Sequence, residues 1–365
     1  MAILAAGSQK EKKLDSITQI ALGATIGEAG FRKRLGGRGT IWGGFCGLAP
    51  DLDILWSSGD QWFSIVNHRG VTHSLLVIPF AAFAFGYLGR WFGKKKGSYL
   101  DWVHLSFWAL ITHPLLDLCT SYGTMLFAPV SDQRFAIDAV SIIDPIYSLI
   151  LFLVVALAIR RSRREFAQRA AVVGLVVTTL YLGAGYLWSN TARDIAHDQL
   201  IAQGIEPTKI RALPTFFNNR LFRICARDRD GTLFIGYYSL VAPRPIEFVE
   251  LSPVETEAVH HARATERGQI FDWFSDDLTS VTIDDNGRLV LAAQIYGLYL
   301  DRTDRGPFRV AAEPEGDGFG PLEWIPRDEN TEGLGDEVDA FWELLTTGSV
   351  RAWRTPESVS EPADR

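Results

Sequence analysis

The hydrophobic residues of this 365-residue chain are concentrated in its first half, in long runs separated by short polar or basic segments. Four runs are close to the ~20 residues that a helix needs to span a bilayer. Two shorter, glycine-rich runs precede them; a run of that length alone is more typical of a buried soluble helix. The long runs are Leu75–Trp91, Tyr99–Leu118, Ile142–Ile159 and Ala170–Trp188, and the shorter ones are Ile17–Ala29 and Thr40–Leu55. Four long runs in succession predict a multi-pass membrane domain.

The pattern changes from about Phe216 onward to short alternating runs, which are typical of β-strands. Asp230-Gly231 and Asn286-Gly287 each lie between two such runs, and both dipeptides favour a hairpin turn. Helical patterns cover Val254–Phe274 and Asp336–Thr346. The predicted fold class is therefore an all-α polytopic membrane domain followed by a smaller soluble α+β domain. The expected bounds are 1–189 for the first, 190–355 for the second and 356–365 for a disordered tail.

Charge divides the chain at the same place. Before Asn190 there are 12 acidic and 18 basic residues, a net charge of +6; from Asn190 onward there are 31 and 18, a net charge of −13, which gives −7 in total. Basic residues in short loops favour the cytoplasmic side. Three clusters mark such loops: Arg32–Arg34 with Arg38, Lys94–Lys96, and Arg160–Arg164. They predict a periplasmic or extracellular acidic domain, and the first residues do not resemble a cleavable signal peptide.

Histidines and aspartates recur in the first half at spacings suited to a metal ion. His113 and Asp117 are four residues apart, which places both on one face of a helix. His68 and His73 bracket a glycine turn, and Thr72 between them could orient a ligand. We therefore take His68, His73, His113, Asp117 and Glu28 as candidate metal ligands, and Asp51, Asp53, Arg69 and Asp138 as candidate catalytic residues.

The types of ligand atom limit which metal ion could bind and which reaction it could support. A mixture of imidazole and carboxylate fits zinc, manganese or iron better than calcium. One ion or two would activate water for hydrolysis, with a carboxylate taking the proton and Arg69 steadying an anion. Glu28 is alternatively an interfacial charge. The remaining histidines, which we interpret as structural or surface residues, are His104, His197, His260 and His261.

The motifs together resemble the bacterial family of LexA-binding, inner-membrane-associated hydrolases, also described as membrane-bound metal-dependent hydrolases. The resemblance covers about the first 150 residues. It is carried by Asp15–Gln19, Ala24–Glu28, Pro50–Asp53, His68–Ser74, His113–Asp117 with Thr120 and Tyr122–Thr124, and Phe135, Asp138, Ser141 and Asp144-Pro145. It implies a polytopic inner-membrane protein with a metal site and a regulatory contact. Some relatives carry histidine where this chain has Gln19, so no ligand is expected there.

The leading hypothesis is a metal-dependent hydrolase that acts on a lipid or phosphoester at the outer face of the bacterial inner membrane, with the bilayer as its main partner. A membrane scaffold or regulator with a structural metal is the alternative. A transporter fits less well because its ionisable groups would lie near mid-membrane. No nucleic-acid partner is expected, since the chain has no basic DNA-binding motif and its second half is acidic. Three scattered cysteines predict neither a disulfide framework nor a thiolate site.

Overall fold

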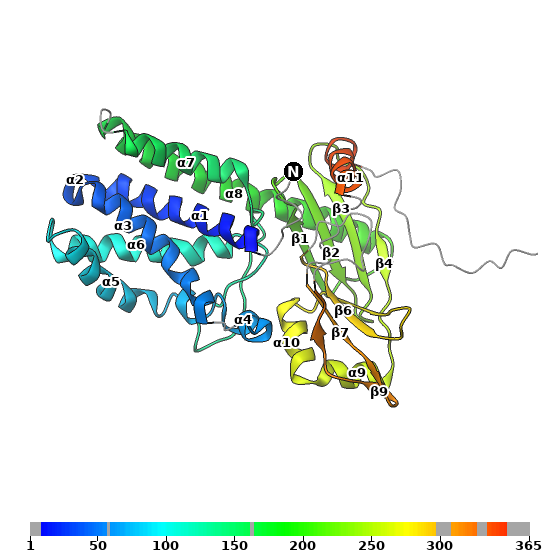
Figure 1. Ribbon diagram of the computed structural model, residues 1–365. Helices are drawn as coiled ribbons and strands as arrows, with labels where there is room; N and C mark the ends of the chain where they lie inside the picture. The colour runs from blue at the N-terminus through cyan, green and yellow to red at the C-terminus, as the bar shows by residue number, and fades with distance from the viewer. Residues whose placement is uncertain (1–8, 57–58, 161–163, 297–307, 327–333, 349–365) are drawn as a thin grey trace, which may run out of the picture. The chain divides into compact units, whose positions relative to one another are not determined.

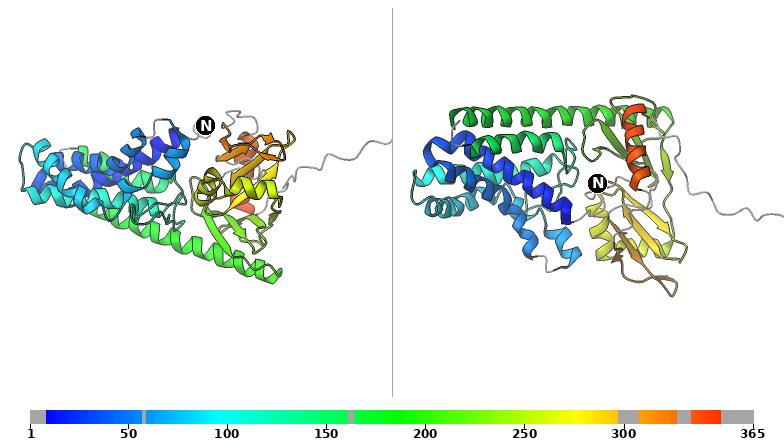
Figure 2. Two further views of the ribbon diagram at one scale, coloured as in Figure 1. Left: turned by 90° about the horizontal axis from the view of Figure 1, so that it is seen from below. Right: turned by 45° about the horizontal axis from the view of Figure 1, so that its top comes forward.

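The computed structural model describes residues 9–56, 59–160, 164–296, 308–326 and 334–348. Its internal contacts separate two compact units. The first, called the helical unit here, is Met1–Asp194 with Arg211–Asn219, and the second, the sheet unit, is Ile195–Ile210 with Arg220–Arg365. The boundary predicted near Ser189 lies inside one continuous helix, α8 (Arg164–Ala202), which begins in the helical unit and ends in the sheet unit (Figure 2). The predicted tail, 356–365, lies outside the described residues.

The helical unit is a bundle of helices in which most connections are short, while residues 119–144 form a longer connection between α6 and α7 (Figure 1). Its elements are α1 (Gln9–Ile26), the π-helix η1 (Gly27–Phe31), α2 (Arg32–Leu35), α3 (Gly37–Leu48), the 3-10 helix η2 (Ala49–Trp56), α4 (Gln61–Asn67), the 3-10 turn η3 (Val71–His73), α5 (Ile78–Phe92), α6 (Tyr99–Leu118), α7 (Pro145–Ile159) and the first part of α8. The local sequence determines where several of these helices begin. Ser98 and Asp101 form a capping box on α6, and Asp144 caps α7 just before Pro145.

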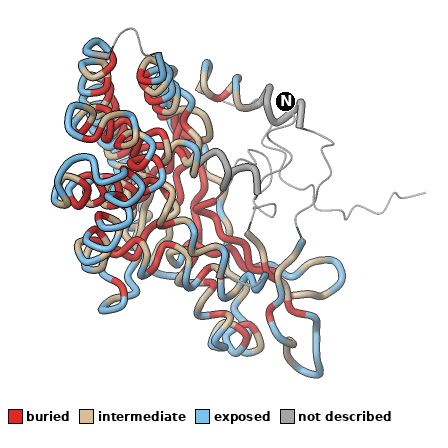
Figure 3. The backbone as a smooth tube through the Cα atoms, turned by 60° about the vertical axis from the view of Figure 1, so that its left-hand side comes forward, coloured by how far each residue is buried: buried red, intermediate tan, exposed pale blue. Residues whose placement is uncertain are grey.

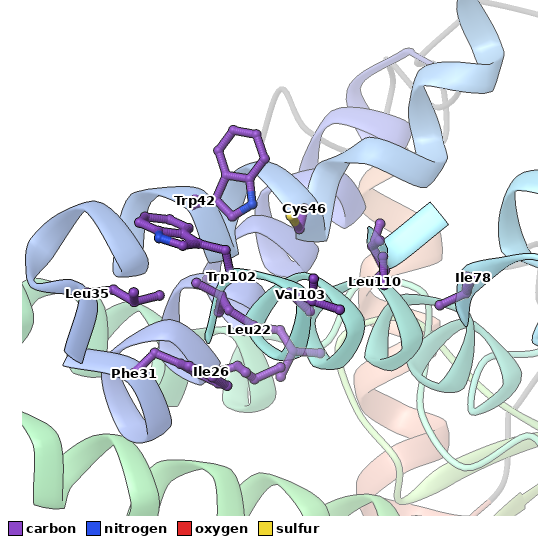
Figure 4. Close-up of a cluster of buried hydrophobic side chains, with 14 of the residues drawn as sticks. Leu22, Ile26, Phe31, Leu35, Trp42, Cys46, Ile78, Trp102, Val103 and Leu110 are labelled. Atoms are coloured by element: carbon purple, nitrogen blue, oxygen red, sulfur yellow. The ribbon is translucent and has the colours of Figure 1, made fainter. Parts of the chain in front are cut away.

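The core of this unit is built from aromatic and aliphatic side chains of α1, α3, α5 and α6 (Figure 4). Trp102 is fully buried and meets Trp42 edge to face, with ring centroids 6.4 Å apart. The indole of Trp42 donates a hydrogen bond to Ser106 Oγ over 3.0 Å, so its polar atom is satisfied inside the core. Buried residues gather on the inward sides of the helices (Figure 3).

Helices α1 and α3 cross at glycines. A Cβ atom on Gly43 would lie 2.2 Å from the backbone oxygen of Gly23, and one on Gly47 would lie 2.3 Å from the backbone oxygen of Gln19. Real side chains cannot approach that closely, so only glycine permits this contact. The glycine-rich segments that precede the long apolar runs therefore form a tight helix pair, which brings the end of α3 against Gln19.

The predicted fold class is wrong in its membrane domain. Among the described residues, one helix is long and apolar enough to cross a membrane, Glu165–Ala202, or two if the bent pair Gln61–His73 and Ile78–Phe92 counts as one span. Helices α5 and α7 have 15 residues each, about 22 Å of helix against a hydrocarbon core of about 30 Å. The apolar runs do form helices, but most are too short or too polar to span, so the multi-pass topology is not supported.

The sheet unit contains most of the strands. One four-stranded sheet has the order β1-β2-β3-β4, a second has β10-β7-β6-β5, and β8 pairs with β9. The bounds are β1 (Lys209–Pro214), β2 (Leu221–Arg227), β3 (Leu233–Ser239), β4 (Val249–Leu251), β5 (Thr279–Ile283), β6 (Leu289–Ala293), β7 (Arg309–Ala312), β8 (Pro314–Glu315), β9 (Gly318–Phe319) and β10 (Glu323–Trp324). The described part of the C-terminal half therefore combines β-sheets with three further helices.

Both predicted hairpins are confirmed. Strands β2 and β3 pair antiparallel around Asp230-Gly231, and β5 and β6 pair around Asn286-Gly287. The predicted helix over Val254–Phe274 is divided instead into α9 (Glu257–Ala264) and α10 (Glu266–Phe274). Thr265 lies between them, where its hydroxyl accepts a hydrogen bond from the Gly268 backbone N–H and caps α10. The last helix is α11 (Leu334–Thr347).

Candidate metal centre

Two of the predicted ligands come from the last turns of α6. His113 and Asp117 lie on the same face of this helix, as their spacing predicts, and both are buried. His113 Nε2 is 3.6 Å from Asp117 Oδ2. The pair therefore places one imidazole nitrogen and one carboxylate oxygen side by side inside the helical unit.

Two short 3-10 segments bring the other groups. Asp51 lies in η2, directly after the end of α3, and His73 ends η3. His73 is fully buried, and its Nε2 lies 3.1 Å from His113 Nε2 and 3.6 Å from Asp51 Oδ1. Residues far apart in the sequence thus converge on one point, and Asp51, His73 and His113 form a group whose ligand atoms all lie within 4.8 Å of one another.

The geometry of this group is compatible with a bound metal ion. Asp51 Oδ1 lies 3.3 Å from His113 Nε2, and Asp117 Oδ2 lies 3.4 Å from His73 Nε2. Five of the six distances among these four atoms range from 3.1 to 3.6 Å; the sixth joins Asp51 to Asp117, and Asp117 is not in the group within 4.8 Å. A tetrahedral zinc ion with bonds of about 2.0–2.1 Å separates its ligand atoms by about 3.3 Å. We will call Asp51, His73, His113 and Asp117 the His/Asp cluster.

The hydrogen bonds of the two Nδ1 atoms, which point away from the cluster, determine that Nε2 of each imidazole faces the other ligand atoms. His113 Nδ1 lies 2.6 Å from the backbone oxygen of Gly47, which can only accept, so Nδ1 carries the proton. His73 Nδ1 lies 2.9 Å from Thr72 Oγ1, and that hydroxyl donates to Asp53 Oδ2 over 2.8 Å. His73 Nδ1 can therefore donate to Thr72, and when both imidazoles are neutral their Nε2 atoms present lone pairs to the centre, as ligating histidines do.

Two lone pairs cannot face each other at 3.1 Å without a positive charge or a proton between them. Burial alone would lower the pKa of His113, but the carboxylates of Asp51 and Asp117 raise it to about 9. Burial would likewise raise the pKa of Asp51, but the charges and hydrogen bonds of His113 and His73 hold it well below its usual value. The surroundings thus favour a cation at this point, and Asp117 Oδ2 accepts no hydrogen bond from any described residue.

Asp53 and His68 lie beside the cluster and bind each other. His68 Nδ1 is 2.9 Å from Asp53 Oδ1, while the second oxygen of Asp53 accepts from Thr72. Asp53 also receives the backbone N–H of Arg69 over 3.4 Å. The structure does not bring His68 or Asp53 into the group of mutually close ligand atoms. Their contacts instead fix the loop that carries His73.

Arg69 lies at the rim of the cluster. It is buried, and its Nε is 3.4 Å from Asp117 Oδ2. Its guanidinium group lies over the ring of Tyr122, 4.7 Å from the centroid, and donates to Thr120 Oγ1. A positive φ of 62° at Arg69 turns the chain between His68 and His73. Arg69 is therefore close enough to hold an anionic group next to the cluster.

Two further predicted site residues also lie outside the cluster. Glu28 is in η1, where its Oε2 accepts hydrogen bonds from Thr40 and Arg32 over 2.7 and 3.2 Å. Asp138 forms a two-pronged ion pair with Arg211, at 3.0 Å to Nε and 2.6 Å to Nη2. Both carboxylates thus have cationic partners of their own, and the geometry gives neither a place among the ligand atoms.

Three contacts of the cluster were not predicted. Gln19 Nε2 donates to Asp117 Oδ1 over 3.0 Å, and Ser16 Oγ donates to Asp51 Oδ2 over 2.9 Å. The backbone oxygen of Gly47 is the partner of His113. The glycines of the first two apolar runs were the sequence signal for a close helix pair at this point.

Comparisons with known proteins support a membrane-associated family. Residues 14–192, just under half of the chain, match the family model described as YdjM inner membrane protein. The match includes every member of the His/Asp cluster and supports an inner-membrane location. The description names neither a hydrolase activity nor a LexA contact.

A curated relative is the uncharacterized protein YfhP of Bacillus subtilis (strain 168), 29% identical over 100 residues. That alignment covers 27% of this chain and 29% of the relative, so the chain spans less than a third of the relative's length. No solved structure is significantly similar to the chain. The periplasmic position expected for the second half depended on several spans, and it loses that support with them.

Proposed function

We propose that this protein is a membrane-associated, metal-dependent hydrolase whose metal ion is held by Asp51, His73 and His113. The observation that carries the proposal is the pair of buried Nε2 atoms 3.1 Å apart, each fixed through its other nitrogen and flanked by carboxylates. Two imidazoles and carboxylate oxygens fit zinc, manganese or iron better than calcium. The inner-membrane family match supports the location.

A divalent ion in such a site supplies an acidic water molecule and polarises an ester oxygen. The chain's own residues would provide the rest. Asp117 Oδ2, which no described residue hydrogen-bonds, is suited to take a proton. Arg69, buried beside it, is suited to bind a negatively charged oxygen. A cationic group next to the cluster favours a phosphoester over a neutral ester, and a membrane location favours a lipid phosphoester.

A structural metal site is the second candidate, and a specific observation supports it. Asp117 Oδ2 lies within 3.6 Å of both Nε2 atoms, so it could serve as a fourth protein ligand. Four protein ligands close a tetrahedral site and leave no position for water, as in structural zinc sites. In that case the ion would hold α6 against η2 and η3, and the protein would act as a membrane scaffold.

Metal analysis combined with a hydrolysis assay tests the proposal. The full chain, purified in detergent, is assayed for bound metal and for hydrolysis of bis(p-nitrophenyl) phosphate before and after chelation. We expect chelation and each of His73→Ala and His113→Ala to remove both the metal and the activity. His104→Ala is the matched control, because His104 is an exposed histidine on the same helix as His113.

Asp117→Asn separates the two candidates. If Asp117 takes a proton, the variant keeps its metal and loses activity. If Asp117 is the fourth ligand of a structural site, the variant loses metal and thermal stability, and the unaltered protein has no activity to lose. Metal bound without any metal-dependent hydrolysis across phosphomonoester, phosphodiester and carboxylic-ester probes would reject the enzyme and leave the scaffold.

A further inference from the structure

A pocket lies on the helical unit away from the His/Asp cluster. It is half open, has a volume of about 610 Å³, and is formed where α8 passes α2 and the end of η1. The residues of this pocket that matter here are Lys33, Glu165, Gln168, Arg169, Val172 and Val173. We will call it the α8 pocket. None of these residues belongs to the proposed metal centre.

The α8 pocket and the His/Asp cluster are at opposite ends of the bundle. Arg34, the neighbour of Lys33, binds Asp101 in the first turn of α6 over 2.7 Å, whereas Asp117 is in the last turn of the same helix. Sixteen residues of helix separate Asp101 from Asp117, about 24 Å at 1.5 Å per residue. The pocket is therefore a separate site.

The pocket presents two cations and one anion. Lys33 and Arg169 are exposed and form no ion pair within the described parts of the chain, while Glu165 supplies the one carboxylate of the pocket. Gln168 Nε2 donates to the backbone oxygen of Ala29 over 3.0 Å, which fixes α8 against η1 beside Lys33. The lining thus carries a net positive charge, and the contact between α8 and η1 holds this charge in a fixed place.

More basic residues surround this end of the helical unit. Arg38 Nη1 donates to the backbone oxygen of Gly93, and Lys96 Nζ lies beside Gly36. The loop at Lys94–Lys96 therefore meets the segment Arg32–Arg38. Two basic clusters that are distant in the sequence share one end of the bundle with Arg169, and together they create a positive field that attracts an anion.

The other wall of the pocket is apolar. Val172 and Val173 are 48% and 60% exposed, and both lie on the one described helix that by itself is long and apolar enough to cross a membrane. Val176, Val177 and Leu180 continue this exposed apolar surface along α8. Inorganic phosphate would gain nothing from such a wall, whereas a phospholipid would place its phosphate at the cations and its acyl chains along the valines.

We propose that the α8 pocket binds an anionic phospholipid, with Lys33 and Arg169 holding the phosphate of the headgroup and Val172 and Val173 contacting its acyl chains. Each basic side chain near an anionic headgroup attracts the lipid. Removal of both should therefore lower the affinity about 30-fold. The site would bind the protein to anionic lipid at this end of the helical unit.

The test uses the full chain in a neutral detergent, titrated with fluorescent phosphatidylglycerol and, separately, with fluorescent phosphatidylcholine. We expect phosphatidylglycerol to bind more tightly, and the double variant Lys33→Gln with Arg169→Gln to bind it about 30-fold less tightly. The charge-preserving double variant Lys33→Arg with Arg169→Lys should retain the affinity. The control is Arg193→Gln with Arg229→Gln, which removes the same charge from two exposed surface ion pairs.

Several results would overturn the proposal. Equal affinity of the Gln variant and the unaltered protein would show that the pocket does not bind the headgroup. Equal binding of the two lipids would mean apolar adhesion alone. Full competition by millimolar inorganic phosphate would assign the cations to free phosphate. If the Gln variant lost its helical circular dichroism, the Arg/Lys variant would carry the test, and loss of phosphatidylglycerol affinity in that folded variant would also overturn the proposal.

Discussion

The His/Asp cluster depends on residues that orient its imidazoles as much as on the ligand atoms. His113 is fixed by the backbone oxygen of Gly47, and His73 by the hydroxyl of Thr72, which in turn binds Asp53. Outer partners of this kind set the tautomer and the ring orientation of a ligating histidine. Asp53 therefore contributes through Thr72, although its own oxygens are outside the group of mutually close ligand atoms.

Thr72→Val should weaken metal binding about 10- to 100-fold without abolishing it, because valine keeps the shape of threonine but cannot accept the His73 Nδ1–H. Competition with a chelating dye measures the affinity. Thr112→Val is the matched control, since the Thr112 hydroxyl bonds only to backbone oxygens of its own helix among the recorded contacts. An unchanged metal affinity in Thr72→Val would show that Thr72 and Asp53 do not orient His73 for metal binding.

At this scale the sequence predicted which residue types meet, but not all of their partners. The spacing of His113 and Asp117 required one helix face, and the structure has it. His68 and His73 have the same chemistry and flank the same turn, yet His68 is held by Asp53. Which of two nearby histidines faces inward depends on the backbone of the turn, including the positive φ at Arg69, which spacing alone does not reveal.

Among the elements, the crossing of α1 and α3 positions the site, because it brings Gly47 and Gln19 to α6. Gly43→Ala would place a Cβ atom 2.2 Å from the backbone oxygen of Gly23 and force the helices apart. We expect a loss of about 1–3 kcal/mol in the free energy of unfolding, the cost typical of overpacking. Thermal unfolding in detergent, followed by circular dichroism, measures it.

Gly30→Ala is the control for that substitution, because nothing lies within 4 Å of a Cβ atom at Gly30. It should leave the midpoint of unfolding near that of the unaltered protein. Equal midpoints for Gly43→Ala and Gly30→Ala would show that the helices are not in close contact at Gly43.

Most individual elements could be predicted from the sequence. The wrong prediction was that most of the apolar helices span a membrane. Helix α6 has the predicted bounds, Tyr99–Leu118, and both hairpins have the predicted turns. Hydropathy alone could not separate a spanning helix from a helix that carries a site. In α6, Asp117 and His113 are buried for the cluster, and they lower the mean hydropathy that a span requires.

For the molecule as a whole, the chain returns to the helical unit within its first strand, β1. Residues Arg211–Asn219 belong to this unit, and Arg211 there forms the two-pronged ion pair with Asp138. The sequence predicted a single boundary because its charge and hydropathy change only once. It could not reveal a short segment that comes back, since nothing in the composition of Arg211–Asn219 marks it as part of a helical unit.

Arg211→Met in the full chain should destabilise the helical unit by about 3 kcal/mol, because it leaves the largely buried Asp138 carboxylate without its cation. Denaturant unfolding of the purified protein gives the value. Arg193→Met, which breaks an exposed pair with Asp194, should change stability by less than about 1 kcal/mol. Similar small effects for both variants would show that the Arg211 pair does not hold the returning segment.

The central claim is that the His/Asp cluster binds a divalent metal ion, and elemental analysis of the full-length protein tests it most directly. Protein purified without chelator should contain about one equivalent of zinc, manganese or iron, and the double variant His73→Ala with His113→Ala should contain almost none. His104→Ala should retain the full content. Equal metal content in the double variant and the unaltered protein, or no metal in either even after incubation with all three ions, would contradict the account.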